Sequence, residues 1–349
     1  MERSATIRVA ATTVVLVVLG ACGGGGGGDA APTSSTPATT TTEAASDVPA
    51  PSAGCSSDVA GGPVDEPRTL VVDGTERTYL YLGPERAPGD GPAPLVIDFH
   101  GLAEGADLHR VVSRLDALAT REGFALATPS GTGEPVAWGV STDASNPDLR
   151  FVDALIDEIG LRDCVDLRRV YAIGLSNGAM LSSTLACASS DRIAAIATVA
   201  GLTDPPACAP DRAVPVISFH GTDDAILLFN GGVGDLGTAL EGGSPSMPEG
   251  YVADLDGAGI PAAAAAWAAR NGCEAAPTDD RVAPDVLRRS YTCPQDAEVV
   301  SYVVEGGGHS WPGSEMSASL ASVIGRTTTS IDANELAWAF FQRHRTPTT

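Results

Sequence analysis

The stretch at residues 169–180, RVYAIGLSNGAM, decides the fold of this chain. An apolar run leads into the pattern Gly-x-Ser-x-Gly around Ser176, and small residues typical of a buried helix follow it. This is the sequence form of a nucleophile elbow, a sharp strand-to-helix turn that presents a serine hydroxyl. A Cβ at Gly174 or Gly178 would collide with the neighbouring strand or helix. We therefore predict a strand, an exposed nucleophile and a helix in this order.

Two later loops carry polar residues that follow apolar, strand-like runs. Residues 214–219 lead into Asp223 and Asp224, and residues 298–304 lead into a glycine-rich loop that contains His309. The order serine, acid, histidine, each after a strand, is typical of an α/β-hydrolase. Taken singly, such residues also serve as a helix cap, a solvated turn or a polar loop residue. Their joint order favours the catalytic interpretation.

The predicted mechanism assigns one role to each of these residues. His309 takes the proton of Ser176 and returns it to the leaving alcohol, and Asp224, preferred to Asp223, fixes the tautomer of the histidine. The backbone N–H of Asn177 and that of Leu102, which follows a predicted strand at residues 94–99, are expected to form the oxyanion hole. Three other histidines, at positions 109, 220 and 344, are not chosen as the base.

Four motifs together carry a family resemblance: strand-His-Gly, Arg-Val-Tyr-x-x-Gly-Leu-Ser-Asn-Gly, His-Gly-Thr-x-Asp and Gly-Gly-His-Ser-Trp-Pro-Gly. Over about residues 65–345 the chain resembles the secreted esterases grouped with poly(3-hydroxybutyrate) depolymerases and feruloyl esterases, including actinobacterial lipoproteins. The resemblance implies Ser176 as nucleophile, His309 as base and Asp224 as acid. It also implies hydrolysis of carboxylic esters without metal or cofactor. Residues 228–259 match no motif of the family.

The N-terminus resembles a bacterial lipoprotein signal. Basic residues precede an apolar run at residues 9–19, which is too short to span a bilayer and ends in Leu-Gly-Ala-Cys. We expect a signal peptide at residues 1–21 and lipidation of Cys22. Residues 22–54, rich in Gly, Ser, Thr and Pro, are expected to form a tether. The protein is then exported and either anchored to the outer face of the membrane or located in the cell wall or medium.

The remaining cysteines and the charge agree with an exported enzyme. With Cys22 lipidated, six of the seven cysteines remain, and an even number in an exported chain argues for disulfides. Proximity in sequence favours the pairs Cys187–Cys208 and Cys273–Cys293, which leaves Cys55–Cys164. A formal net charge of -23 disfavours binding to nucleic acid or to an anionic membrane surface, so the lipid would be the membrane contact.

Residues 55–349 are expected to form one α/β-hydrolase domain with a mostly parallel sheet and helices on both faces. Strands are predicted at residues 69–72 and 77–82 and near residues 95, 125, 170, 195, 216 and 300, and helices at 108–122, 149–159, 176–188, 262–271 and 333–345.

The substrate is less defined than the reaction. Trp311 and Trp138 follow predicted strands, so they are candidates for lining an acyl or aromatic pocket. A soluble or oligomeric ester is favoured over crystalline polyester. The alternatives are an acyltransferase that uses the same acyl-enzyme, a non-catalytic binding lipoprotein, and a serine peptidase on this fold.

Overall fold

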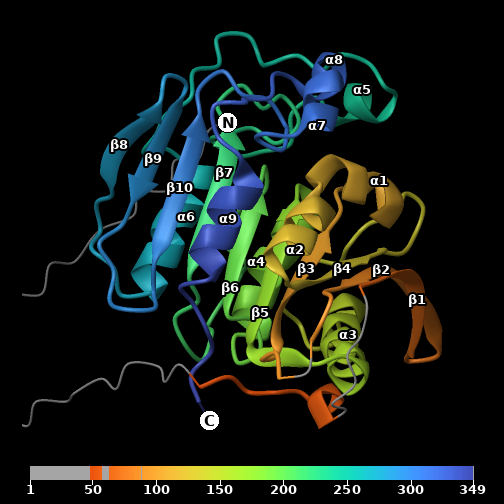
Figure 1. Ribbon diagram of the computed structural model, residues 1–349. Helices are drawn as coiled ribbons and strands as arrows, with labels where there is room; N and C mark the ends of the chain where they lie inside the picture. The colour runs from red at the N-terminus through yellow and green to blue at the C-terminus, as the bar shows by residue number, and fades with distance from the viewer. Residues whose placement is uncertain (1–47, 57–62, 88, 349) are drawn as a thin grey trace, which may run out of the picture. The chain divides into compact units, whose positions relative to one another are not determined.

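The structure is a computed structural model that describes residues 48–56, 63–87 and 89–348 (Figure 1). The predicted signal peptide at residues 1–21, the predicted lipidation site Cys22 and most of the predicted tether lie outside these residues. Within the described part of the chain, no helix has the length and apolar character needed to cross a membrane.

A ten-stranded sheet forms the centre of the domain, in the order β1-β2-β4-β3-β5-β6-β7-β10-β9-β8. The inner strands β4, β3, β5, β6, β7 and β10 run parallel, and antiparallel strands flank them on both sides. Inner strands such as β3 and β7 are buried along their whole length, because helices cover both faces of the sheet. The predicted α/β-hydrolase fold is thus confirmed. The strands are β1 (Val64–Val72), β2 (Thr75–Gly83), β3 (Ala93–Phe99), β4 (Ala125–Pro129), β5 (Val165–Leu175), β6 (Ala195–Val199), β7 (Val216–Gly221), β8 (Thr278–Ala283), β9 (Val286–Ser290) and β10 (Val299–Val304).

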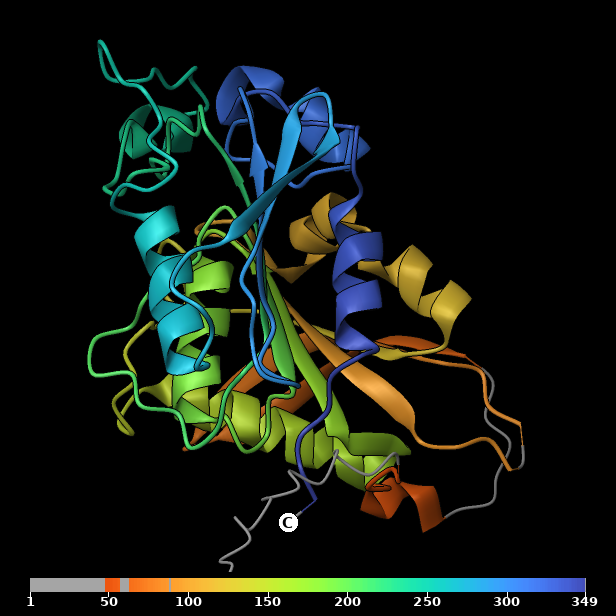
Figure 2. The same cartoon turned by 90° about the vertical axis from the view of Figure 1, so that its left-hand side faces the viewer.

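The helices form two layers, one on each face of the sheet (Figure 2). Helices α3, α4 and α6 cover one face and α1, α2 and α9 the other, and each layer has its own hydrophobic core. The short helices α5, α7 and α8 lie beyond the carboxyl ends of the parallel strands (Figure 1). The helices are η1 (Ala53–Ser56), α1 (Gly105–Ser113), α2 (Leu115–Glu122), α3 (Pro147–Arg162), α4 (Asn177–Ala188), α5 (Leu236–Leu240), α6 (Ile260–Arg270), α7 (Glu315–Ser319), α8 (Ala321–Ile324) and α9 (Ala333–Phe341).

Besides the short helices α5, α7 and α8, which were not predicted, two parts of the fold differ from the sequence prediction. The single helix predicted at residues 108–122 is broken at Arg114, whose φ of 55° is left-handed and so ends α1 and redirects the chain into α2. This break lets Leu115 and Leu118 pack into the core of their layer. The β8–β9 hairpin was not predicted, because β8 is mostly exposed and lacks the apolar run of a buried strand.

Residues 48–56 pack against the domain instead of belonging to the tether, which was predicted to extend through Gly54. The hydroxyl of Ser52 donates to the carbonyl of Asp163 at 2.8 Å and accepts the N–H of Val165 at 3.0 Å. The disulfide Cys55–Cys164 joins the same two segments. These contacts fix residues 52–55 against residues 163–165, so the folded domain begins before residue 55. The other disulfides are Cys187–Cys208 and Cys273–Cys293, so the six cysteines pair in the order that sequence proximity favours.

Candidate active site

Ser176 lies at the turn between β5 and α4 with a left-handed backbone, φ 55° and ψ −116°. Few non-glycine residues adopt such a conformation, and strain of this kind concentrates at functional sites. The two glycines of the motif permit close backbone contacts. A Cβ on Gly174 would lie 2.5 Å from the carbonyl carbon of Gly178, and a Cβ on Gly178 would lie 2.2 Å from the carbonyl oxygen of Phe99. The turn therefore allows α4 to pack closely against β5 and β3, and Ser176 lies at the carboxyl ends of these two strands.

Asp224 and His309 form a buried pair in the loops after β7 and β10. Oδ2 of Asp224 lies 2.8 Å from Nδ1 of His309, and Oδ1 accepts the N–H groups of Ile226 and Leu227 at 2.9 Å each. Asp224 is 0% exposed, whereas the side chain of Asp223 faces solvent. Of the two neighbouring aspartates, only Asp224 contacts His309.

The environment of Asp224 keeps its carboxylate ionised. Burial by itself would raise the pKa of Asp224, but the charge interaction with His309 and hydrogen bonds from His220 and His309 outweigh burial and hold the pKa well below its usual range. A permanently charged carboxylate can orient an imidazole and stabilise it when it gains a second proton.

The sheet places Ser176 and the Asp224–His309 pair at the same edge, since β5, β7 and β10 run parallel. The loops after β7 and β10 also touch, because a Cβ on Gly221 would lie 2.1 Å from the carbonyl oxygen of Gly307. Among the described residues, no hydrogen bond joins the Ser176 hydroxyl to His309. In enzymes without substrate, such bonds are often long or poorly aligned.

The loop after β3 passes directly beside Ser176. A Cβ on Gly101 would lie 3.6 Å from the Cβ of Ser176, an ordinary van der Waals distance, so the backbone of Gly101 is a direct neighbour of the serine. The side chain of Asn177 accepts the backbone N–H of Trp138 at 2.7 Å and donates to its carbonyl at 3.1 Å. These contacts hold the start of α4 against a third loop and leave the backbone N–H of Asn177 at the first helical position, where no intrahelical acceptor exists.

The two tryptophans considered for substrate binding lie in the interior. Trp138 is 3% and Trp311 is 1% exposed. The indole N–H of Trp138 donates to the carbonyl of His100 at 3.0 Å, and that of Trp311 donates to Asn334 at 2.9 Å. Both side chains thus brace loops, and neither lines the cavity described below, because their apolar surface is already used by the core.

His220, which was not predicted to take part in the site, contacts the buried acid. Its Nε2 lies 3.2 Å from Oδ2 of Asp224 and 2.9 Å from the carbonyl oxygen of Leu227. Its position four residues before Asp224 in the His-Gly-Thr-x-Asp motif is the signal that indicates this role. His220 thus contacts the same carboxylate oxygen that binds His309.

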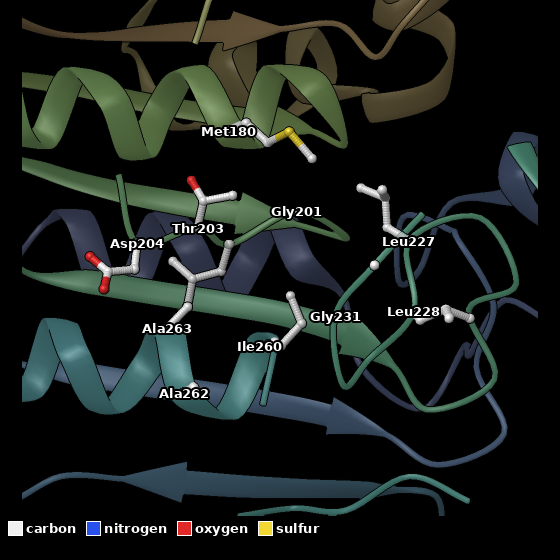
Figure 3. A pocket seen from close by; sticks show the side chains of 13 residues that line it. Met180, Gly201, Thr203, Asp204, Leu227, Leu228, Gly231, Ile260, Ala262 and Ala263 are labelled. Atoms are coloured by element: carbon white, nitrogen blue, oxygen red, sulfur yellow. The ribbon is translucent and has the colours of Figure 1, made fainter. Parts of the chain in front are cut away.

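A cavity of about 330 Å³ opens between α4, α6 and the loops after β6 and β7 (Figure 3). Its lining is mostly apolar, with Met180 from α4 facing Ile260 from α6, while Asp204 lies at one end and Leu227 and Leu228 at the other. The cavity adjoins the elbow, because Gly201 lines it and a Cβ on Gly201 would lie 2.5 Å from the carbonyl oxygen of Ser176.

Residues 228–259, which match no sequence motif, form part of the wall of this cavity. The segment closes at its base, where the N–H of Ile260 donates to the carbonyl of Phe229 at 2.9 Å. A Cβ on Gly259 would lie 2.2 Å from the backbone nitrogen of Gly231, so glycine is required at this close approach. Inside the segment, the side chain of Asn230 binds the backbone of Asp254 through both its oxygen and its nitrogen.

A family model described as Esterase PHB depolymerase matches residues 77–252. The chain belongs to this family. It is 33% identical over 257 residues to NocK of Nocardia uniformis subsp. tsuyamanensis, an esterase by name, with 70% of this chain and 74% of that protein covered. Feruloyl esterase B of Piromyces equi is 30% identical over 244 residues, which cover 67% of this chain and 42% of that protein.

A solved structure, the acetyl xylan esterase from Aspergillus awamori, shares the fold with a TM-score of 0.50 at 13% identity and covers 70% of this chain and 94% of that one. Membership of the esterase family makes this chain a hydrolase of carboxylic esters. The predicted enzyme class is therefore confirmed.

Proposed function

We propose that the protein is an exported serine esterase in which Ser176, His309 and Asp224 act as a catalytic triad. The observation that carries this proposal is the buried Asp224–His309 pair at the same sheet edge as a serine in a left-handed elbow. The three residues are far apart in sequence and each follows a separate strand, which is the arrangement of acyl-transfer enzymes on this fold.

In the proposed mechanism, Nε2 of His309 removes the proton from the Ser176 hydroxyl while Oγ of Ser176 forms a bond to the ester carbonyl carbon. The tetrahedral intermediate expels the alcohol, which takes the proton from His309, and an acyl-enzyme remains. Water then repeats the sequence and releases the carboxylic acid, so the serine regains its proton. Asp224 stays ionised throughout and stabilises the imidazolium form of His309.

Backbone N–H groups are the proposed stabilisers of the oxyanion. The N–H of Asn177 lies at the start of α4, where the helix dipole also favours negative charge. The second donor is the N–H of Leu102, because the preceding Gly101 lies against Ser176 and its own N–H is engaged by Glu104 at 2.7 Å.

The cavity beside Ser176 is the proposed site for the acyl group of the substrate. Its apolar lining and size suit a short aliphatic chain or one aromatic ring better than a charged group. The name of the Piromyces equi relative is consistent with an aromatic acyl group, and the family description with a hydroxyalkanoate. A soluble or oligomeric ester is the proposed substrate.

The proposed location is the outer face of a membrane, through lipid on Cys22. The lipobox-like sequence before Cys22 and the disulfides of the described domain support export. Mass spectrometry of the protein from its membrane fraction would show the diacylglyceryl modification on an N-terminal Cys22 peptide. A Cys22→Ala variant found in the same fraction would overturn the anchor.

The function is tested by turnover of purified residues 48–349 on p-nitrophenyl esters of increasing chain length, methyl ferulate and hydroxybutyrate oligomers. We expect hydrolysis that falls at least about a thousandfold in Ser176→Ala with no change in the unfolding temperature. Activity that survives in Ser176→Ala would overturn the nucleophile. Product that appears only when an acceptor alcohol is added would identify an acyltransferase instead of a hydrolase.

A further inference from the structure

The backbone of Gly101, beside the proposed nucleophile, is held from two sides by buried side chains. Its N–H donates to Oε2 of Glu104 at 2.7 Å, and its carbonyl lies 2.6 Å from Nδ1 of His100. The N–H of Gly131 donates to Nε2 of His100 at 2.9 Å. Because a backbone N–H can only donate, Nε2 is the acceptor and Nδ1 carries the proton that binds the Gly101 carbonyl.

This arrangement also fixes the next N–H along the chain. The carbonyl of Gly101 and the N–H of Leu102 belong to one planar trans peptide and point in opposite directions. His100 holds this peptide through the Gly101 carbonyl, and Glu104 holds the preceding peptide through the Gly101 N–H. Together they restrict the peptides on both sides of Gly101, and with them the direction in which the N–H of Leu102 points.

Glu104 in turn belongs to a buried charge cluster. The same atom, Oε2, lies 3.1 Å from Nδ1 of His109, whose Nε2 lies 2.7 Å from Oδ1 of Asp98. Oδ2 of Asp98 accepts the hydroxyl of Ser113 at 2.7 Å. Glu104 has 10% and His109 0% side-chain exposure. Since burying a charge is costly, a cluster of this kind is retained only where its members are paired.

The protonation of the cluster follows from its geometry. Burial lowers the pKa of His109, but Asp98 and Glu104 outweigh burial and raise it to about 10. At neutral pH His109 is thus an imidazolium that donates to both carboxylates. Burial by itself would raise the pKa of Glu104. The charge and hydrogen bond of His109 and the N–H of Gly101 outweigh burial and lower the pKa, so Glu104 is ionised.

We propose that Glu104 is a positioning residue that holds Gly101 so that the Leu102 N–H faces the oxyanion, while His109 offsets the negative charge of Glu104. The offset is needed because an unpaired carboxylate next to the site would oppose the charge that develops on the substrate oxygen. This inference rests on the proposed function, and it adds a residue that does not touch the substrate.

Two substitutions separate the hydrogen bonds of Glu104 from its charge. Glu104→Ala removes the acceptor of the Gly101 N–H. Glu104→Gln keeps it, because one oxygen accepts both the Gly101 and the His109 hydrogen bonds and an amide oxygen can take that place. We expect kcat on p-nitrophenyl butanoate, counted per site titrated with a fluorophosphonate, to fall about 10- to 100-fold in Glu104→Ala with KM changed less than about threefold, and to stay within about threefold in Glu104→Gln.

A trifluoromethyl ketone reports the oxyanion site directly, since its adduct with the serine carries a negative oxygen at the same place. In Glu104→Ala its inhibition constant is expected to rise by the factor by which kcat/KM falls. Ser113→Ala is the matched control, because it removes a hydrogen bond of the same cluster on the side away from Gly101; it is expected to lower the unfolding temperature and leave kcat within about threefold.

Unchanged kcat per titrated site in Glu104→Ala would overturn the proposal, and so would a loss of kcat without weaker binding of the ketone. If Glu104→Ala does not fold, Glu104→Asp replaces it: this variant keeps the charge but is one methylene too short for Gly101, so it should lose more kcat than Glu104→Gln. Equal kcat in Asp and Gln variants would contradict the positioning role. Failure of the triad itself is recognised separately, because Ser176→Ala would then keep its activity.

Discussion

Asp224 binds His309 with one carboxylate oxygen and the backbone of its own loop with the other. Oδ2 lies 2.8 Å from Nδ1 of the histidine, while Oδ1 accepts the N–H groups of Ile226 and Leu227. The carboxylate is therefore unable to rotate without loss of hydrogen bonds, and the proton on Nδ1 is fixed. This leaves Nε2 of His309 as the nitrogen available to Ser176.

The two neighbouring aspartates should respond differently to the same substitution. Asp224→Asn is expected to lower kcat about 10³- to 10⁴-fold, because the amide favours the wrong tautomer of His309. Asp223→Asn changes an exposed side chain and should stay within about twofold. Steady-state kinetics on p-nitrophenyl butanoate measure both, and a larger loss in Asp223→Asn would show that the acid is misassigned.

His109 should make the fold sensitive to alkaline pH. Its pKa is raised to about 10 in the folded protein, compared with about 6.5 in an unfolded chain, so the folded state binds this proton more tightly. The stabilisation is therefore fully present below about pH 6.5, decreases above it and is lost as the pH passes about 10. Urea unfolding between pH 6 and pH 10 should show this decline in the free energy of unfolding.

The control for this pH effect is His109→Gln, which cannot take up a proton. Its free energy of unfolding should be lower at pH 6 but should change less between pH 6 and pH 10 than that of the wild type. Parallel pH curves for the two proteins would mean that His109 is neutral in the fold.

The cavity beside the elbow should select for acyl length. Ala263→Phe places a ring inside the cavity lining, so kcat/KM for p-nitrophenyl octanoate should fall at least about 10-fold while that for the acetate stays within about threefold. Ala265→Phe on the same helix is exposed and lies outside the lining, which makes it the matched control. An equal loss for acetate and octanoate would place the acyl group elsewhere.

The disulfides should contribute unequally to stability. Cys55–Cys164 closes a sequence separation of 109 residues and Cys187–Cys208 one of 21. Replacing both cysteines of a pair by serine should lower the free energy of unfolding by about 4–5 kcal/mol for the first and about 3 kcal/mol for the second, if chain entropy dominates. Urea titration at neutral pH measures both, and the reverse order would rule out that explanation.

The sheet and the residues at its carboxyl edge could be predicted because local patterns determine them. A buried parallel strand is a continuous apolar run, and the polar residue that ends it, such as Asp224 or His309, is visible in sequence. The elbow of Ser176 was equally visible, since its two glycines and the serine stand together in one short motif, although the contact that requires Gly178 is with Phe99 on a distant strand.

The charge cluster of Asp98, Glu104 and His109 could not be predicted, because it forms only through packing between separate elements. His109 lies in α1 and Asp98 in β3, and their contact is set by how the helix packs on the sheet. One signal was present: Asp98 is a carboxylate within the apolar strand PLVIDF, and a buried charge needs a partner. The break at Arg114 gave no signal in the sequence, because arginine has no preference for the left-handed backbone that the packing imposes.

Residues 230–259 leave the sheet and return at a neck where Phe229 and Ile260 are hydrogen-bonded. Further bonds tie the segment to the domain: the N–H of Gly234 donates to the carbonyl of Ile226 at 2.9 Å, and Arg289 of β9 donates to Asp256 at 2.7 Å. Because this segment forms part of the cavity wall, substitutions at its lining positions would reshape the cavity while β5, β7 and β10, which position Ser176, Asp224 and His309, stay unchanged.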